Sequence, residues 1–194
     1  MKKQLFIFAL LSTFLLYNCR NNTTSSGQKD NADGEFYPIG SFIRSQLMYI
    51  DSMPLAVIKY TTLDNITDTT LMEKNDFKAT AADFMTPDIG SPGLKPQYNE
   101  TSFVDATLGT ITLTYTAMHM DTGIKKADIL LDQENTSVKN IYIEKILTGA
   151  DSSVTKKMLW TANRNCQITT LVRKKGQPEK IILERYVWDD RPPL

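Results

Sequence analysis

Apolar residues recur along the chain with two different spacings, which separate helical segments from a long run of strands. Between residues 37 and 53, the positions Ile39, Phe42, Ile43, Leu47 and Ile50 keep the three- and four-residue spacing of one helix face. A proline stands just before this face begins, where its missing N–H does no harm, and another follows the segment. The pattern predicts an amphipathic helix over residues 37–53.

A hairpin and a second helix are predicted next. Residues 55–63 and 69–74 are rich in β-branched and apolar side chains, and the polar residues 64–68 between them are typical of a turn. Residues 75–85 return to helical spacing, with polar residues at the start that can cap a helix. Residues 87–98 hold three prolines and two glycines, which predict an irregular loop.

The remainder of the chain has strand character only. In residues 110–118 threonines alternate with apolar residues, so one face of this strand is predicted to meet the core and the other to meet water. Five similar segments follow, at residues 126–133, 138–147, 154–162, 166–174 and 180–188. Short turns between them favour antiparallel neighbours. We therefore predict an α+β fold, with two helices packed on one face of a bent antiparallel β-sheet, a meander of about six to eight strands.

The N-terminus has the pattern of a secretory signal. Two lysines precede the apolar run of residues 5–17, which is shorter than the roughly 20 residues of a membrane-spanning helix. A buried N-terminal helix is the alternative, but the run has no polar face. A signal peptide over residues 1–18 is the prediction.

The sequence that ends this run, Leu16-Tyr17-Asn18-Cys19, resembles the lipobox of bacterial lipoproteins. In that family the cysteine thiol receives diacylglycerol and the chain is cut just before it. The resemblance implies that Cys19 is the lipid anchor. The family prefers a small residue where Asn18 stands, and looser motifs of this kind occur among Bacteroidota lipoproteins. A plain signal peptide that is cut elsewhere is the alternative.

Residues 19–34 are predicted to form a flexible tether. They are almost entirely polar, and such a segment buries too little apolar surface to offset the entropy of ordering it. Removal of residues 1–18, with two lysines, would leave 20 basic and 22 acidic residues and a net charge near −2. Nucleic acid is therefore an unfavourable partner. Residues 35–194 show no second linker or repeat, which favours a single domain.

A second resemblance covers most of residues 36–188. The segments "FIRSQLMYIDSMPLAVIKYTTL" and "DFKATAADFMTPDIGSPGLKPQY" are similar to a family of Bacteroidota lipoproteins without an assigned activity. The resemblance implies a lipoprotein with one domain, and it implies no chemistry. By analogy with lipoprotein sorting, Arg20 after the anchor favours the outer membrane, with the domain facing the periplasm.

Candidates for catalysis or metal binding are few. Cys166 lies in a strand-like run, and with one histidine in the whole chain a nucleophile pair is disfavoured against a buried thiol. His119, with Asp121 two residues later, lacks the third ligand that zinc requires, so a surface turn is the favoured interpretation. We predict no cofactor, no metal and no catalytic residue.

Two further patterns were weighed as sites. Asp132, Glu134 and Thr136 alternate as oxygen ligands, but Ser137 and Ile143 stand where a calcium loop needs glycine and glutamate. Aromatic residues gather on the late strands, where the core is the simplest location. The alternative is that a bent sheet presents them to a glycan, lipid or peptide. These candidate ligand-face aromatics are Tyr142, Trp160, Tyr186 and Trp188.

Three functions follow from these features. The leading hypothesis is a non-catalytic envelope lipoprotein, anchored at the outer membrane, that acts as a binding or scaffolding module for a protein, glycan or lipid. The alternative is a carrier or acceptor of an apolar, lipid-like ligand in a cavity under the bent sheet. A hydrolase is the third, disfavoured by the scarcity of histidine and cysteine.

Overall fold

The structure is a computed structural model that describes residues 34–119 and 123–191. The predicted signal peptide, the anchor Cys19 and nearly all of the predicted tether lie outside the described residues. So does Asp121, the partner suggested for His119. Every statement on structure below concerns the described part of the chain.

Nine strands form one antiparallel sheet, with two helices and two short 3₁₀ segments. In chain order the elements are α2 (Ile39–Ser52), β1 (Val57–Leu63), β2 (Ile66–Met72), α3 (Lys74–Ala81), η1 (Ala82–Phe84), η2 (Lys95–Gln97), β3 (Tyr98–Asp105), β4 (Thr110–Ala117), β5 (Ile124–Asp132), β6 (Val138–Thr148), β7 (Ser152–Thr161), β8 (Asn165–Lys174) and β9 (Lys180–Val187). The spatial order is β2-β1-β9-β8-β7-β6-β5-β4-β3. The strands β3 to β9 therefore form a meander, and the β1–β2 hairpin extends it beside β9.

The turn of the β1–β2 hairpin has the geometry that its sequence favours. Asp64 and Asn65 have φ values of 49° and 65°, and the flanking residues Leu63 and Ile66 pair across the hairpin. Two-residue hairpin loops favour positive φ at both positions, and aspartate and asparagine tolerate that conformation. This turn sets the register of β2 on β1.

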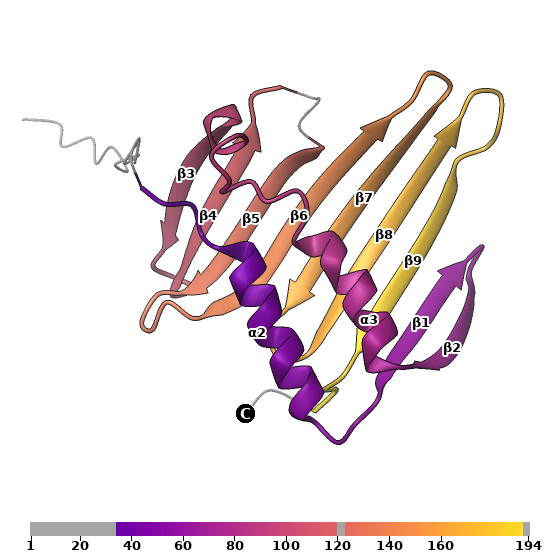
Figure 1. The fold of residues 1–194 in the computed structure, drawn as a ribbon, viewed down its shortest axis with the longest axis horizontal. Helices are drawn as coiled ribbons and strands as arrows, with labels where there is room; N and C mark the ends of the chain where they lie inside the picture. The colour runs from indigo at the N-terminus through magenta and orange to yellow at the C-terminus, as the bar shows by residue number, and fades with distance from the viewer. Residues whose placement is uncertain (1–33, 120–122, 192–194) are drawn as a thin grey trace, which may run out of the picture.

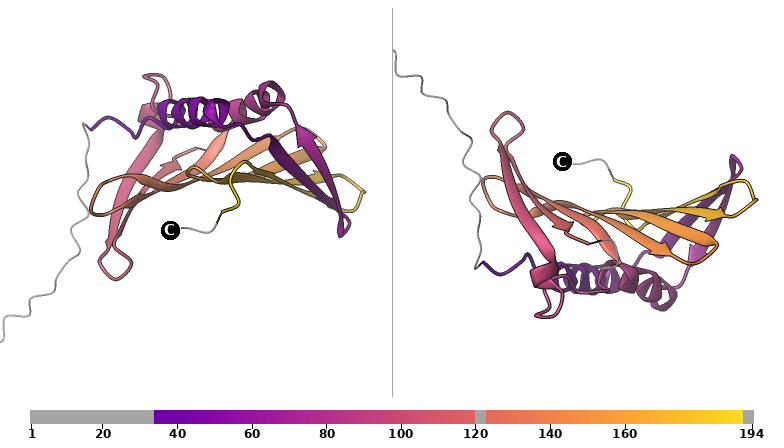
Figure 2. Two further views of the ribbon diagram at one scale, coloured as in Figure 1. Left: turned by 90° about the horizontal axis from the view of Figure 1, so that it is seen from below. Right: turned by 90° about the horizontal axis from the view of Figure 1, so that it is seen from above.

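Both helices lie on one face of the sheet (Figure 1). Seen along the sheet, the sheet is strongly twisted, and the tips of the hairpins β1–β2 and β3–β4 point away from the helix layer (Figure 2). We call the side with the helices the helix-side face and the other the outer face. In Figure 1 the ends of β6 to β9 at the hairpins β6–β7 and β8–β9 extend beyond α3, so the helices cover only part of the helix-side face.

An aromatic cluster joins α3 to the sheet. The ring of Phe77 on α3 lies 5.9 Å from Trp160, 5.6 Å from Tyr186 and 5.5 Å from Trp188, between ring centroids. Phe84 on η1 meets the edge of Trp160 at 5.1 Å. Offset and edge-on ring contacts of this kind add to the free energy of burying the rings. This cluster is one end of a core that lies between the helices and the strands β4 to β9.

One polar residue on the buried face of α2 has its hydrogen bonds supplied by a turn. The amide of Gln46, 7% exposed, donates to Oδ1 of Asn163 at 2.9 Å and accepts from the backbone N–H of Asn163 at 2.7 Å. Asn163 has a φ of 60° in the β7–β8 turn. Because a buried amide without partners would be costly, this contact fixes α2 over that turn.

The predicted fold class is confirmed at the level of an α+β fold with two helices and one antiparallel sheet. The predicted strand number was too low, because residues 99–109, which hold most of β3, were assigned to no element. Only Tyr98 of this edge strand is buried, and most of its other residues are exposed. An edge strand with no covered face lacks the alternation by which strands are recognised in a sequence.

Two neighbouring residues on β7 test the assignment of the faces. Trp160→Ala should lower the free energy of unfolding by about 3–5 kcal/mol, because it empties the centre of the aromatic cluster. Leu159→Ala on the outer face, where Leu159 is 38% exposed, should cost less than about 1 kcal/mol. Urea denaturation of both variants measures the difference. Equal losses would show that the outer face is also packed.

Candidate functional site

The four aromatic residues predicted to share a ligand face lie on different surfaces. Trp160, Tyr186 and Trp188 are buried, with exposures of 0%, 2% and 3%, and they pack against α3. Tyr142 is half-buried on the outer face, since it alternates with buried isoleucines on β6. A shared aromatic ligand face is therefore wrong for the three core residues, because α3 covers them.

The other candidates from the sequence are separate from one another. Cys166 is buried between Trp160 and Tyr186 on the neighbouring strands, and burial raises the pKa of its thiol well above the ordinary value. The thiol is therefore protonated at neutral pH and shielded from reagents. His119 lies just after β4. Within residues 34–119 and 123–191, no group of three His, Cys, Asp or Glu side chains could hold a metal ion.

A cleft of about 510 Å³ opens on the helix-side face, where α3 and η1 meet the strands β1, β7, β8 and β9. We call it the charged cleft. Its lining consists of Lys59, Ala79, Thr80, Asp83, Lys156, Ile168, Thr170, Glu184 and Tyr186.

Strand alternation explains why charged side chains meet in this cleft. Lys156 lies two residues before Met158 on β7, and Glu184 lies two residues before Tyr186 on β9. Residues two apart on a strand share a face, so both charges belong to the face that the helices cover. The register then places Lys156 between Lys145 on β6 and Thr170 on β8. The row of Lys145, Lys156 and Thr170 lies at the boundary between the part of the face that the helices cover and the part that they leave uncovered.

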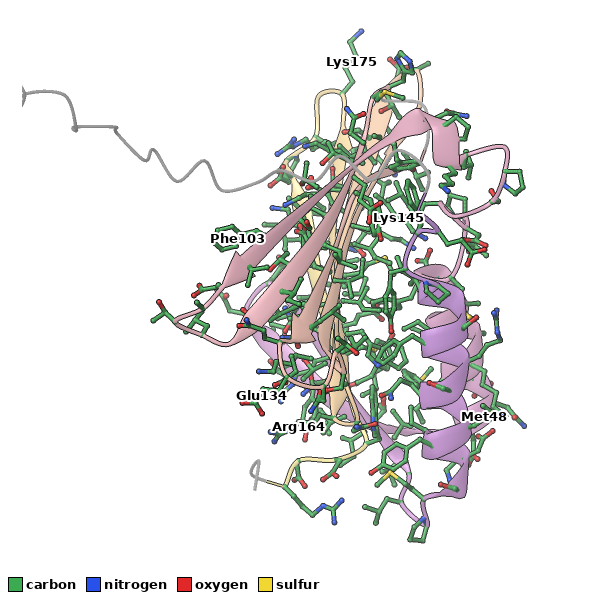
Figure 3. All side chains as sticks on the ribbon, turned by 90° about the vertical axis from the view of Figure 1, so that its left-hand side faces the viewer. Met48, Phe103, Glu134, Lys145, Arg164 and Lys175 are labelled. Atoms are coloured by element: carbon green, nitrogen blue, oxygen red, sulfur yellow. The ribbon has the colours of Figure 1, made fainter. Side chains whose placement is uncertain are left out.

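Asp83, on η1, bridges two lysines that lie opposite each other on the sheet. Its Oδ1 accepts from Nζ of Lys145 at 2.6 Å, and its Oδ2 accepts from Nζ of Lys156 at 2.5 Å. Lys145 is only 5% exposed, and it also donates to the backbone carbonyls of Asp83 and Thr86. Figure 3 shows Lys145 on the side of the sheet that faces the helices. The carboxylate offsets the repulsion between the two ammonium groups.

The same contacts keep Asp83 ionised. Partial burial disfavours the charged carboxylate, but hydrogen bonds from Lys145 and Lys156 outweigh burial, and the pKa of Asp83 is lowered. Lys145 needs these acceptors in turn, because a buried ammonium without them would be strongly destabilising. The segment after α3 is therefore tied to β6 and β7 by a charge network.

A second ion pair forms the other wall of the charged cleft. Nζ of Lys59 lies 2.6 Å from Oε1 of Glu184 and 5.6 Å from the centroid of the Tyr186 ring. The hydrogen bond with Glu184 is the main reason that the pKa of Lys59 is raised. Burial raises the pKa of the Tyr186 phenol. Lys59 and Tyr186 therefore stay protonated at neutral pH.

The two half-buried lysines of the charged cleft, Lys59 and Lys156, have unused hydrogen-bond donors. Each ammonium group carries three N–H bonds. Lys145 uses all three, on the two acceptors of Asp83 and the carbonyl of Thr86. Lys156 has a hydrogen bond to Asp83, and Lys59 has its close contact with Glu184 and the ring contact. The cleft thus offers donors to an incoming group that carries acceptor oxygens.

The charge of the network also favours such a group. Three lysines and two carboxylates give a net charge of +1. The hydroxyl group of Thr170 lines the same space and can donate as well, whereas that of Thr80 bonds to the Tyr186 phenol. The cleft is therefore suited to one anionic group with acceptor oxygens: a carboxylate, a sulfate or a phosphate.

A second cleft, of about 490 Å³, lies between the end of α2 and the start of α3. Its one lysine, Lys74, donates to the backbone carbonyls of Asp51 and Met53 and so joins the two helices. Because the hydrogen bonds of Lys74 hold the two helices together, the charged cleft is the better candidate for a binding site.

The sequence carries a signal for the charged cleft: charged residues at inward positions of the strands. Lys145 stands at an inward position two residues after Ile143, where the alternation of β6 predicts an apolar side chain. Lys156 and Glu184 break the inward patterns of β7 and β9 in the same way. Three charges at inward positions of nearby strands indicate a polar site on the covered face.

Comparison with known proteins finds no match: no family model, no curated protein and no solved structure is similar to the chain. Within the described residues, no helix is long and apolar enough to cross a membrane. The interpretation of the site therefore depends on its geometry.

Asp83→Asn should lower the free energy of unfolding by about 1–3 kcal/mol at neutral pH, because Lys145 and Lys156 lose their shared charge partner. The folded-state pKa of Asp83 is lowered, so its contribution is present above the unfolded-state pKa near 3.8 and is lost as the pH falls through the folded-state value. Urea denaturation of both proteins at about pH 7 and about pH 3 should therefore show a difference that shrinks in acid.

The control for this experiment is Asp51→Asn. Asp51 pairs with Lys78 at 2.8 Å, but both side chains are about 40% exposed, and exposed pairs contribute at most about 1 kcal/mol. A difference for Asp83→Asn that is the same in acid and at neutral pH would contradict the charge network.

Proposed function

We propose that the chain is a non-catalytic binding module of the bacterial envelope, held at the outer membrane by lipid on Cys19, and that the charged cleft is its binding site. The observation that carries the proposal is the pair of partly used ammonium groups, Lys59 and Lys156, that line one cleft. Such groups recognise acceptor oxygens without needing a cofactor.

The ionisation of the cleft supports binding over proton transfer. A general acid or base works best when its pKa lies near the working pH. The pKa of Asp83 is shifted down and that of Lys59 up, each away from neutrality. The charges of both groups are therefore constant through the neutral range, which favours electrostatic recognition.

The entry point of the chain supports a tethered arrangement. The carbonyl of Gly34 accepts from Nζ of Lys95 at 2.7 Å, and Phe36 packs on Tyr115 with 4.4 Å between ring centroids. The chain thus joins the domain beside β3 and β4, while the strands that line the charged cleft lie toward the other edge of the sheet (Figure 1). A tether attached there would leave the cleft open to the periplasm.

The alternative function is a carrier of an apolar ligand, and the filled core changes where that ligand could lie. The space beneath α3 that an enclosed ligand would need is filled by Phe77, Phe84, Trp160 and Trp188. An apolar ligand would therefore have to lie on the surface of the sheet beside the cleft, where the helices end.

Membrane attachment is tested by intact-mass analysis of the protein isolated from membranes. We expect the mature chain to begin at Cys19 and to carry the added mass of acyl chains, and Cys19→Ala to lose both the lipid and the membrane association. Two or more acyl chains anchor a protein stably, so the change in membrane association should be nearly complete. A chain cut elsewhere, with an unmodified thiol, would refute the anchor.

Binding at the charged cleft is tested by a photo-crosslinking amino acid placed at Thr170 in the intact envelope. The matched control is the same substitution at Thr112, a half-buried threonine on the outer face. We expect one defined adduct from position 170 and none from position 112, with the mass of the adduct giving the class of ligand. Adducts from both positions, or from neither, would contradict the proposed site.

A further inference from the structure

A band of aliphatic side chains continues from the charged cleft across the uncovered part of the helix-side face. We call it the aliphatic strip. It comprises Leu63, Ile66, Leu147, Val154, Val172 and Ile182, from β1, β2, β6, β7, β8 and β9.

The register of the sheet shows that these side chains are neighbours on one face. Thr170 in the charged cleft pairs with Ile182, Ile182 pairs with Leu63, and Leu63 pairs with Ile66. In the next row Val154 pairs with both Leu147 and Val172. Directly paired residues of antiparallel strands have adjacent side chains on the same face. The strip therefore consists of two adjoining rows that begin at the cleft.

The strip is accessible. Leu147 is 54% exposed and Ile66 is 75% exposed, while the other members are half-buried. Neighbouring strands lie about 4.8 Å apart, so the six strands from β6 to β2 span about 24 Å. Contiguous exposed apolar surface of this kind marks an interaction site.

Lysines lie near both ends of the strip, and one carboxylate, Asp68, lies on the same face beside Ile66 on β2. Lys174 and Lys180 occupy positions on the same face at its far end, in addition to the lysines of the charged cleft. The part of this face beyond the helices, together with Asp83, has five lysines and three carboxylates. These are Lys59, Lys145, Lys156, Lys174 and Lys180, and Asp68, Asp83 and Glu184. The whole chain has a formal net charge of +0. This face is therefore both aliphatic and cationic, although the protein as a whole is not basic.

We propose that the charged cleft and the aliphatic strip together bind one anionic single-chain amphiphile, such as a fatty acid. Its head group accepts hydrogen bonds from Lys156 and Lys59, and its hydrocarbon chain lies across the strands over Ile182 and Leu63. The inference rests on the proposed function of the cleft and names the class of its ligand.

The shape of the surface distinguishes this ligand from a membrane. The donors lie in a cleft against α3 and η1, whereas a bilayer needs its basic partners at an open surface. The strip has one aliphatic side chain on each of six neighbouring strands, which matches the narrow outline of one hydrocarbon chain. Charge complementarity with the lysines requires that the head group be an anion.

The test uses the full chain in nanodiscs of zwitterionic lipid and a dodecanoate that carries a photoreactive diazirine in its chain. At about pH 8, where a carboxylate is ionised, light should attach the probe to residues of the strip, as mapped by peptide mass spectrometry. Lys156→Gln should reduce the labelling about tenfold at limiting probe, since a charge-assisted hydrogen bond is lost. The corresponding photoreactive alcohol, which has no charge, should label the strip weakly in all variants.

A matched pair on β8 separates the strip from general effects on folding. Val172→Gln places an amide in the strip, whereas Leu171→Gln places it on the outer face at the next residue, and both positions are half-buried. We expect Val172→Gln alone to reduce labelling, with equal urea midpoints for the two variants. For the unmodified chain, labelling should also fall as salt is raised, because the head group is held by charge.

Labelling outside the strip, equal labelling by the acid and the alcohol, or loss in both glutamine variants would overturn the amphiphile. In a second set of discs that contain a photoreactive anionic phospholipid, labelling by that phospholipid in place of the free acid would assign the face to a bilayer and would overturn it as well. If position 170 still captures a protein or glycan in the envelope while dodecanoate fails, the proposed binding site stands and only the ligand class is wrong. If neither the crosslinker at position 170 nor dodecanoate gives the expected adducts, both the binding site and the ligand class are wrong.

Discussion

The burial of one ammonium group, that of Lys145, determines how the helices cover the sheet. A lysine at 5% exposure must have acceptors for its three N–H bonds, and all of them come from the segment just after α3: two from Asp83 and one from Thr86. The segment cannot move along the sheet without leaving that charge unpaired. Phe77 lies on α3, more than one helical turn before Asp83. It packs on three core rings and so fixes α3 itself on the sheet. Together the two contacts define where the helix layer ends.

The candidate site follows from that end point. Because η1 stops over Lys145 and Lys156, the next rows of the sheet are left uncovered, and the inward positions there change from aromatic to charged and then to aliphatic. The core beneath α3 is filled, so the proposed ligand would have to bind at the surface, at the margin of the helices. The outer face carries Tyr142, a row of threonines and its own ion pairs, Lys126–Asp128 and Lys125–Glu144, on β5 and β6, away from the aliphatic strip. One margin thus combines the features that the proposed ligand class needs.

Elements with a covered face were predictable from the sequence, and elements without one were not. Ile39, Ile43 and Ile50 predicted α2 because that helix buries one stripe, whereas β3 has no covered face and its residues carry no period. Tyr142, Trp160 and Tyr186 were placed on strands correctly, whereas Trp188 lies just after β9. Their burial depends on where α3 crosses the sheet, which the spacing within a strand cannot show. The charged cleft joins residues from Lys59 to Tyr186, which are far apart in the sequence. The only pattern in the sequence that indicated it is the alternation broken by Lys145, Lys156 and Glu184.

The measurement that most directly tests the dependence on Lys145 is amide hydrogen exchange of the unmodified chain beside Lys145→Met. Methionine fills similar space without needing acceptors, so the sheet should keep its core packing. Exchange should then speed up in residues 80–86 by at least about tenfold, while the amides of β7 and β8 keep their protection. Unchanged exchange in residues 80–86 would contradict a helix layer held by the buried ammonium. A uniform loss across the sheet would show that Lys145 supports the whole fold and not the position of α3.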